Sequence, residues 1–411
     1  MTQSKRAGAS TTATRRGFMT FGGAALAALT LSACSSGSFD FGGPTLPSPG
    51  AGEAAATLPA ATGKSFGTGP VRVALLLPLS GDEALATVGT SMANAAELAV
   101  EYVEKTPSLP ANITIVLKDT GPTPAGATQA ASQAVQEGAS LILGPLRAEQ
   151  VSAAGAVARA AGIPVIGFSN NSGAASPGVY LLNVLPESEV RRSMSFAKAQ
   201  GKRAFAGVFP TTDFGRIQEG AFRQAAADLG LNARAVYNFS SEDEARSIVA
   251  QLVPLLQQGQ IDTLFLPDRA TAPSFGVLLE EAGIATGTVQ IIGSADWNGD
   301  AAIASTPYLA GALYPAVDDA GFQALAAEYR ARFGTDPHPL STIAYTAAIL
   351  ANNSALAMGT PKYDRAQLTL QNGFNGRDGV FRFLRDGRSE YALVIKQVTV
   401  GGAAIVDGAK L

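Results

Sequence analysis

The sequence predicts an α/β fold in which parallel sheets are covered by helices on both faces. From Val71 onward, short apolar runs rich in branched residues alternate with stretches of helical spacing, and this alternation is typical of parallel sheets. Runs that are apolar throughout, such as Val73 to Leu77, fit strands that are buried on both sides. The length of 411 residues also allows two or more lobes with cores of their own.

The elements can be followed in order along the chain. The apolar segments predicted as strands are VRVALLLP, ITIVLKD, LILGP, IPVIGFS, AFAGVFP, ARAVYNF, DTLFLP and VQIIGS. Between the first two lies GTSMANAAELAVEYVEK, in which Met92, Ala99 and Val103 share one helical face while Glu97 and Glu101 share the other. This spacing predicts an amphipathic helix that packs on the sheet.

Small polar residues follow the predicted strands. In open α/β sheets, ligands bind at the carboxyl ends of the strands, and here the loops read PLSGDEALATVG, DTGPTPAG, GPLRAEQ and SNNSGAASPG. The candidate ligand-binding residues in these loops are Ser80, Gly81, Leu146, Arg147, Ser169, Asn170 and Asn171. Because Ser, Asn and Gly also form turns and helix caps, a purely structural role stays open at each position.

The motifs of common enzyme classes are missing. Gly167-Phe168-Ser169 begins like a nucleophile elbow, but the second glycine position holds Asn171. The only histidine, His338, lies between two prolines in a predicted surface loop, so a serine triad would lack its general base. No dinucleotide fingerprint, phosphate-binding loop or metal-binding Asp series appears. We therefore predict a protein that is not an enzyme and needs no cofactor or metal.

Composition excludes further classes of protein. The net charge is −3 and no basic stripe is present, so we expect no nucleic-acid partner. A single cysteine rules out an internal disulfide, and one histidine without a cysteine cluster argues against structural zinc.

The N-terminal residues 1–33 are predicted to be a signal peptide. Arg15 and Arg16 precede the apolar segment FGGAALAALTL, which is too short for a ~30 Å bilayer core. Leu31-Ser32-Ala33-Cys34 resembles a bacterial lipobox, and the paired arginines resemble a twin-arginine export signal. This resemblance implies a lipidated Cys34 and a membrane-anchored lipoprotein of the cell envelope that faces the periplasm. An ordinary signal peptide with a coincidental cysteine is the alternative.

Residues 34–69, rich in Gly, Pro, Ala, Ser and Thr, are predicted to be a flexible linker.

Several segments together resemble one family. VRVALLLPLSGDEALATVGTSMANAAELAVEYV resembles the opening of the type I periplasmic binding proteins of the leucine-binding group. The segments LILGPLRAEQ, AGIPVIGFSNN, FPTTDFGRIQEGAFRQAAADLGL and GVFRFLRDGRSEYALVIKQVTVGG resemble later parts of the same family, in the same order. The match runs from about Val71 to the C-terminus.

The resemblance implies two Rossmann-like lobes joined by three crossings, with the ligand in the cleft between them. The expected crossings lie near Asn183–Glu187, near Tyr314–Val317 and between about Asn352 and Arg365. The first lobe would then comprise residues 70–185 and 316–355. The second would comprise 186–315 and 356–411.

The resemblance also implies roles for the candidate residues. Family members that carry amino acids hold the α-carboxylate with the first lobe and the ammonium with an acidic side chain of the second. By motif position, Ser80, Arg147 and Ser169 to Asn171 would hold the carboxylate. Phe214 would be an aromatic lid, and Asp296 with Trp297 would hold the ammonium. The implied partners are an amino-acid-like small molecule and an ABC permease.

The loop Leu146-Arg147-Ala148-Glu149 departs from the Ser or Thr that amino-acid carriers usually have there. Together with GVYLLNVLP and the lone Trp in GSADWNGD, it also resembles the penicillin-binding-protein activators. These lipoproteins use the same fold to stimulate peptidoglycan synthases. The sequence leaves a solute receptor and a synthase activator as alternatives.

Overall fold

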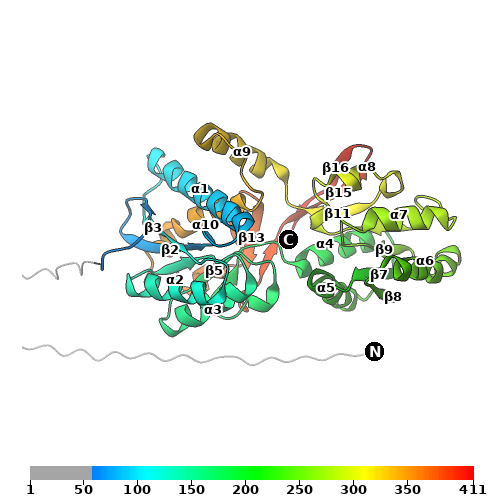
Figure 1. Ribbon diagram of the computed structural model, residues 1–411, viewed down its shortest axis with the longest axis horizontal. Coiled ribbons are helices and arrows are strands. Elements are labelled where there is room, and N and C mark those ends of the chain that lie inside the picture. Colours follow the sequence, from blue (N-terminus) through cyan, green and yellow to red (C-terminus); the bar gives the residue numbers. More distant parts are fainter. Residues whose placement is uncertain (1–57) are drawn as a thin grey trace, which may run out of the picture. The chain divides into compact units, whose positions relative to one another are not determined.

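The computed structural model of the protein describes residues 58–411, and the predicted signal peptide and Cys34 lie outside these residues. Two large sheets carry helices on both faces, and a small third sheet completes the fold (Figure 1). The third sheet packs with the first, and together they form the first lobe. The second sheet and its helices form the second lobe. No helix within residues 58–411 has the length and apolarity needed to cross a membrane.

The first sheet has six strands in the order β1-β3-β2-β4-β5-β6. Only β1 is antiparallel to its neighbour. The strands are β1 (Ser65–Phe66), β2 (Val71–Leu77), β3 (Ile113–Asp119), β4 (Leu141–Leu143), β5 (Val165–Gly167) and β6 (Val179–Leu181). The helices of this lobe are α1 (Glu83–Lys105), α2 (Pro124–Gln136), α3 (Ala148–Ala160), α9 (Asp319–Phe333), α10 (Ser341–Ala351), α11 (Ser354–Ala357) and α12 (Arg365–Leu368).

Strand β2 shows why the apolar runs form central strands. Successive side chains of a strand point to opposite faces of its sheet. Val73 and Leu75 join the core that α1 and α10 cover, while Ala74 and Leu76 join the core that α2 and α3 cover. Both faces are therefore buried, which confirms the predicted fold class.

The linker ends earlier than the sequence predicted. Ser65–Phe66 pairs with β3 as strand β1. Thr62 donates from its hydroxyl to Glu137 Oε1 at 2.7 Å, and Lys118 Nζ lies 2.7 Å from the same carboxylate. These polar contacts hold the segment on the first lobe, and its composition alone did not show them.

The second sheet has seven strands in the order β16-β15-β11-β10-β9-β7-β8. The strands are β7 (Ala204–Pro210), β8 (Asn232–Phe239), β9 (Thr263–Phe265), β10 (Gln290–Ile292), β11 (Leu313–Ala316), β15 (Leu393–Thr399) and β16 (Gly402–Lys410). Helices α4 (Pro186–Ala199) and α5 (Asp213–Leu229) pack on one face. Helices α6 (Glu242–Gln257) and α7 (Ala272–Glu281) pack on the other, and α8 (Ala301–Ser305) follows β10.

The third crossing lies later in the chain than expected. Strands β12 (Phe374–Gly376), β13 (Gly379–Phe383) and β14 (Ser389–Tyr391) form the small sheet. Its alternating aromatic residues pack into the core of the first lobe, where the ring of Phe383 lies 5.3 Å from that of Tyr180. The chain then enters the second sheet as β15. Residues 356–391 therefore belong with the first lobe, and their expected place in the second was wrong.

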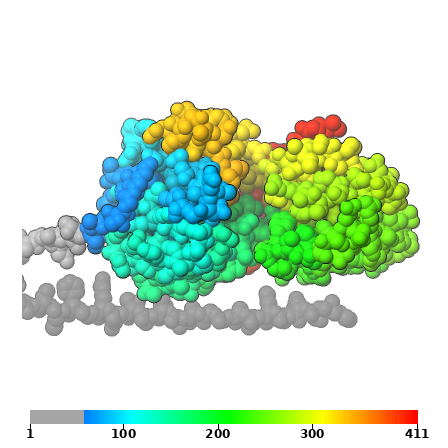
Figure 2. All heavy atoms as spheres, in the orientation of Figure 1, coloured from blue at the N-terminus to red at the C-terminus, as the bar shows by residue number. Residues whose placement is uncertain are grey.

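The C-terminal hairpin of β15 and β16 lies at one edge of the second sheet. Its outer strand is largely exposed, and so are apolar side chains at its tip and in the middle of β16. Val400 is 95% exposed, Ile405 51% and Val406 43%. In Figure 2 the tip stands out from the surface, in red beside the yellow segments.

Candidate functional site

The first-lobe candidates follow three neighbouring parallel strands. Ser80 comes after β2, Arg147 after β4 and Ser169 after β5. Because parallel strands end at the same edge of a sheet, these residues lie along one edge. We call it the first-lobe edge.

The loop that carries Ser80 is tied to a carboxylate at the end of β3. Asp119 accepts hydrogen bonds from the backbone N–H groups of Leu79 and Gly121, both at 2.8 Å. Partial burial raises the pKa of Asp119, but hydrogen bonds from the Ser80 hydroxyl and from these backbone groups outweigh that effect and lower it. The next residue, Gly81, has φ +92° and approaches Pro122 so closely that a Cβ would lie 2.7 Å from its Cδ. The loop is therefore pre-formed, and its serine is exposed.

Arg147 is the N-cap residue of α3 and its side chain makes no capping hydrogen bond. The guanidinium is half exposed and pairs with Glu149 at 2.9 Å. Leu146 packs against the core of the first lobe. An exposed pair of this kind is weak, so the guanidinium can exchange Glu149 for a ligand carboxylate at little cost.

In the loop after β5, most polar side chains form hydrogen bonds within the loop itself. The Ser169 hydroxyl, 5% exposed, accepts from the backbone N–H of Asn171 at 3.1 Å. Asn171 caps the short helix Ser172–Ala174 and accepts from Gly173 N at 3.0 Å. Asn170 is exposed. Two of the three candidates therefore stabilise the turn, and Asn170 is the member that presents its side chain to solvent.

The second-lobe candidates lie along the corresponding edge of the other sheet. Phe214 follows β7 and Asp296 follows β10, with β9 between these strands. Asp296 lies 3.3 Å from Arg269, which comes from the loop after β9 and also lies 3.8 Å from Asp300. Burial raises the pKa of Asp296, and the charge of Arg269 acts against this. Motif comparison did not reveal Arg269. We call this set the second-lobe edge.

Trp297 is a core residue, which corrects its expected role as a ligand contact. The side chain is 1% exposed and packs among the residues under α6 and α7. Its ring fills the space beside Gly293, where a Cβ would come within 2.2 Å of Trp297 Cδ2. A tryptophan that follows a strand is compatible with either a ligand contact or a core position, so the sequence alone could not distinguish these two roles.

Glu189, in the first turn of α4, is a buried carboxyl that the sequence analysis missed. Oε2 accepts from the backbone N–H of Ala295 at 3.2 Å, and Gln218 Nε2 donates to Oε1. Burial without a nearby cation raises its pKa to about 7. Glu189 therefore anchors the loop that carries Asp296.

His338 has a structural role at the start of α10. It is half-buried, and its Nδ1 accepts from Leu340 N at 3.2 Å. Burial lowers its pKa. Residues 58–411 contain no group of three or more His, Cys, Asp or Glu side chains that could hold a metal ion.

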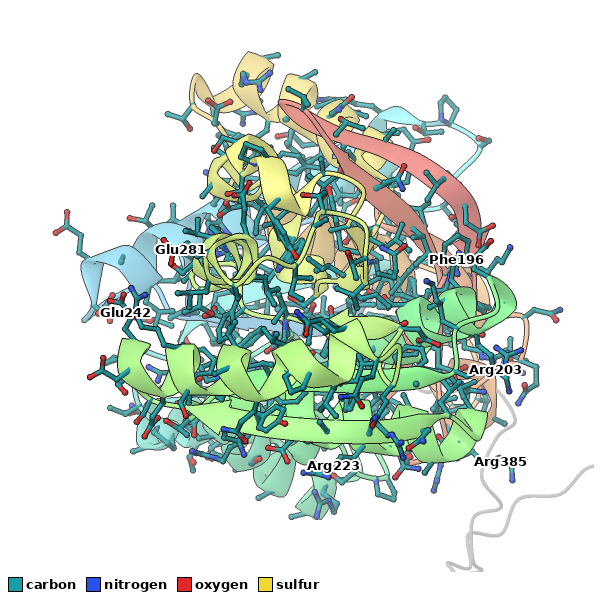
Figure 3. All side chains as sticks on the ribbon, turned by 90° about the vertical axis from the view of Figure 1, so that its right-hand side faces the viewer. Phe196, Arg203, Arg223, Glu242, Glu281 and Arg385 are labelled. Carbon is teal, nitrogen blue, oxygen red and sulfur yellow. The ribbon has the colours of Figure 1, made fainter. Side chains whose placement is uncertain are left out.

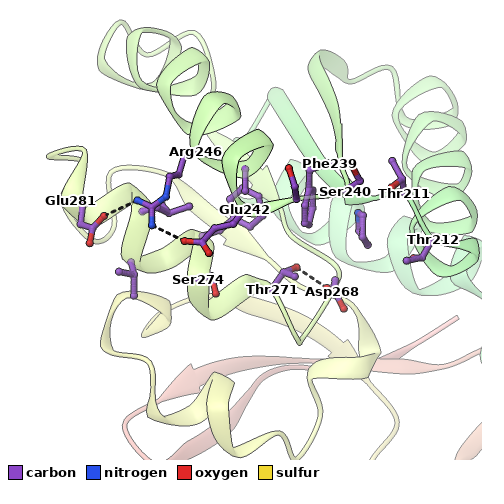
Figure 4. Close-up of a pocket in the computed structure, with 16 residues that line it drawn as sticks. Thr211, Thr212, Phe239, Ser240, Glu242, Arg246, Asp268, Thr271, Ser274 and Glu281 are labelled. Carbon is purple, nitrogen blue, oxygen red and sulfur yellow. Dashed lines mark hydrogen bonds and ion pairs between the residues drawn. The ribbon is translucent and has the colours of Figure 1, made fainter.

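The second lobe also contains a cavity of about 620 Å³. It lies beyond the ends of β7 and β8 and extends between α6 and α7 (Figure 4). Thr211, Thr212 and Asp268 line the part nearest the second-lobe edge, but Phe214 and Asp296 are not among the lining residues.

The comparisons with known proteins agree with this architecture. Residues 70–402 match the family profile described as periplasmic binding protein. No curated protein matches the chain. Among solved structures, a putative branched-chain amino acid ABC transporter protein from Rhodospirillum rubrum is 19% identical with a TM-score of 0.68. The match covers 82% of this chain and 99% of that one.

Two further structures show the same fold at similar identity. A leucine-binding protein from Thermotoga maritima is 19% identical, with a TM-score of 0.54 over 83% of this chain and 99% of its own. A branched-chain amino acid binding protein from Streptococcus pneumoniae, solved with isoleucine, is 19% identical. Its TM-score is 0.53 over 82% of this chain and 99% of its own. The chain therefore belongs to the periplasmic binding protein family and has the two-lobed type I fold of that family.

Proposed function

We propose that the protein is a non-enzymatic receptor that captures an amino acid or a similar small zwitterion between its two lobes and delivers it to an ABC importer. The observation that carries the proposal is the pair of polar edges at the carboxyl ends of the two sheets. One edge offers Arg147, Ser80 and Asn170, and the other offers Asp296.

The two edges complement the two ends of a zwitterion. A guanidinium suits a carboxylate because it can donate two parallel hydrogen bonds, and Asp296 suits an ammonium. Each charged group is now paired within its own lobe, Arg147 with Glu149 and Asp296 with Arg269. All four side chains are about half exposed. Such exposed pairs are worth less than ~1 kcal/mol each, so a ligand can replace them.

The solved relatives support an amino-acid-like ligand. The Streptococcus pneumoniae protein was solved with isoleucine, and a substrate-binding protein from Desulfitobacterium hafniense with leucine. A related solute-binding protein from Rhodopseudomonas palustris was solved with benzoate, so the fold also accepts an acid without an ammonium. An acidic residue on the second lobe favours the zwitterion here.

We further propose that Cys34 carries a lipid and anchors the protein to the membrane on the periplasmic side. The support is the lipobox-like Leu31-Ser32-Ala33-Cys34 and the position of the only cysteine. Radiolabelled palmitate incorporation in cells would test this. The intact chain should be labelled and the Cys34→Ala variant should not.

A second candidate function is the activation of a peptidoglycan synthase, and the exposed apolar hairpin favours it. Val400 at the hairpin turn and the consecutive apolar residues 403–406 of β16 are exposed at the edge of the second sheet. Scattered apolar residues on a surface are ordinary, but contiguous ones mark interaction sites. An Ile405→Asp, Val406→Asp variant should lose synthase binding under this alternative and keep solute affinity under the first.

The proposal is tested by titration calorimetry with amino acids, leucine and isoleucine among them. Arg147→Ala and Asp296→Asn should each weaken binding about tenfold or more, because a hydrogen bond to a charged group is worth ~1.5–3 kcal/mol. Arg159→Ala is the matched control, since Arg159 lies at the other end of α3 and bonds Ser176. If Arg147→Ala and Arg159→Ala bind equally well, the assigned role of Arg147 is wrong.

A further inference from the structure

The cavity between α6 and α7 has the size and lining of a small-molecule site. Its volume of about 620 Å³ falls within the ~300–1,000 Å³ that is common for such sites. Buried Phe239, Phe275 and Leu278 line its depth. The rings of Phe239 and Phe275 meet edge to face with centroids 5.1 Å apart, which gives a firm apolar floor.

The opening of the cavity is acidic. Glu242 and Glu281 come from α6 and α7, and Arg246 lies between them at 2.6 Å from Glu242 and 3.7 Å from Glu281 (Figure 4). Figure 3 shows both glutamates on one side of the lobe, away from Arg203 and Arg223. The single positive charge of Arg246 balances only one of the two carboxylates, so this end of the cavity carries a net negative charge.

The other end of the cavity adds a further carboxylate. Asp268 accepts from the Thr271 hydroxyl at 2.6 Å and from Ala270 N at 3.4 Å. No cation within the described residues lies in ion-pair distance of it. The lining thus holds three carboxylates and one guanidinium. Helix N-termini reduce this negative charge, because each contributes roughly half a positive charge. In α6, however, that positive charge is offset by Glu242, Asp243 and Glu244 in the first turn.

We propose that this cavity is a second binding site, separate from the site between the two edges, and that it takes a small organic cation with an apolar body. The body would lie on Phe239 and Phe275, and the cationic nitrogen would lie near Glu242, Glu281 or Asp268. The hydroxyls of Thr211, Ser240 and Ser274 line the cavity as well and supply neutral hydrogen-bonding groups. The proposal does not depend on a solute binding between the lobes.

The test uses dansylcadaverine, which joins an aromatic body to a primary ammonium, and measures its fluorescence as the purified chain is added. Dansyl-6-aminohexanoic acid has a similar body but carries a carboxylate. At low salt the cation should bind at least about fivefold more tightly than the anion. The difference should shrink in 1 M salt, where the Debye length is ~3 Å.

Two variants block the cavity in independent ways. Ser274 and Val277 are exposed lining residues of α7, so Ser274→Trp and Val277→Trp should fold normally and weaken binding of the cation more than about tenfold. Ser247→Trp is the matched control, because Ser247 is exposed on α6 and does not line the cavity. Circular dichroism and melting temperature verify folding.

The role of the carboxylates is tested by a matched pair of variants that each remove one negative charge. Glu242→Gln should weaken binding of the cation by up to about fivefold, since exposed charge pairs contribute up to ~1 kcal/mol. Asp243→Asn removes a charge from the next position, which does not line the cavity, and should have a smaller effect. Equal affinity for the two probes at low salt, or unchanged affinity in both tryptophan variants, would overturn the proposal. Absence of any cation binding to the unchanged chain would overturn it too.

Discussion

Two buried glutamates, one in each lobe, differ in the partners of their carboxyl groups. In the first lobe, Glu137 is paired with Lys118 at 2.7 Å and also accepts from Thr62. Burial raises the pKa of Glu137, but Lys118 and Thr62 outweigh this and lower it. In the second lobe, Glu189 is buried with Gln218 and the Ala295 N–H as its hydrogen-bond donors, and burial raises its pKa to about 7. The first lobe keeps its buried carboxylate charged, whereas the second lobe holds a carboxyl that titrates near neutral pH.

The same contrast extends to the edges themselves. The first-lobe edge consists of short loops whose polar groups bond to one another, as Leu79 N and Gly121 N do with Asp119 and as Ser169 does with Asn171. The second-lobe edge consists of mutually paired charges, Arg269 with Asp296 and Asp300, and it adjoins a cavity. The loops of the first-lobe edge are held in shape by hydrogen bonds, and Arg147 with Glu149 is its exposed ion pair. The second-lobe edge consists of ion pairs that share Arg269.

The largest expected effect distinguishes Trp297 from its neighbour Asp296. Trp297→Ala should destabilise the protein by about 3–5 kcal/mol, because it removes a large side chain from the core of the second lobe. Urea unfolding followed by circular dichroism measures this. Trp297→Phe, which fills part of the space, should recover part of the loss and keep solute affinity. If Trp297→Ala left stability unchanged and abolished solute binding, the ring would be a ligand contact after all.

Removing the cationic partner of Glu137 should lower the free energy of unfolding by a similar amount. Lys118→Met leaves the Glu137 carboxylate buried without its cation, which should cost about 3–5 kcal/mol in the free energy of unfolding. Lys105→Met on α1 is the matched control, because the Lys105 side chain is 74% exposed in its pair with Glu101 and should contribute under ~1 kcal/mol. Equal losses in the two variants would contradict the contrast drawn between buried and exposed pairs.

Glu189, which has hydrogen-bond donors but no cationic partner, should make the stability of the protein depend on pH. The folded pKa of Glu189, about 7, lies above its ordinary value of 4.5. Folding therefore takes up a proton in this window, so stability falls as the pH rises from about 4.5 to about 7, by up to roughly 3 kcal/mol. In Glu189→Gln this decline should be smaller by that amount. Chemical unfolding at several pH values measures it, and identical profiles for both proteins would show that Glu189 does not titrate there.

The smallest effect on stability is expected at the ion pair of the second-lobe edge. Asp296→Asn removes a pair whose side chains are about half exposed, so stability should change by less than ~1 kcal/mol. Melting temperature is a sufficient measure. A large loss would mean that Asp296 belongs to the framework of the second lobe and is not free to meet a ligand.

Much of the fold could be predicted because its signals are local. The run Val73–Leu77 is apolar on both faces of the strand, which fits a central position in a sheet. The placement of residues 356–391 could not be predicted in the same way. Their alternating aromatic residues show that one face is buried, but not which lobe covers it.

The candidate site was predictable in position more than in detail. Strand ends located Ser80, Arg147 and Asp296 at the two edges. The sequence could not show that Trp297 turns into the core, because that depends on the space left by Gly293. It also could not reveal Glu189 or the cavity, since both arise where separate helices pack together.

The central claim is that the two edges together bind a zwitterionic solute, and thermal unfolding of the purified chain against a panel of amino acids tests it most directly. A ligand at one hundred times its Kd adds ~2.7 kcal/mol of stability. The account predicts a clear rise in melting temperature with one chemical class of amino acid, and loss of that rise in Arg147→Ala. No rise with any amino acid would contradict the account and would favour the synthase activator.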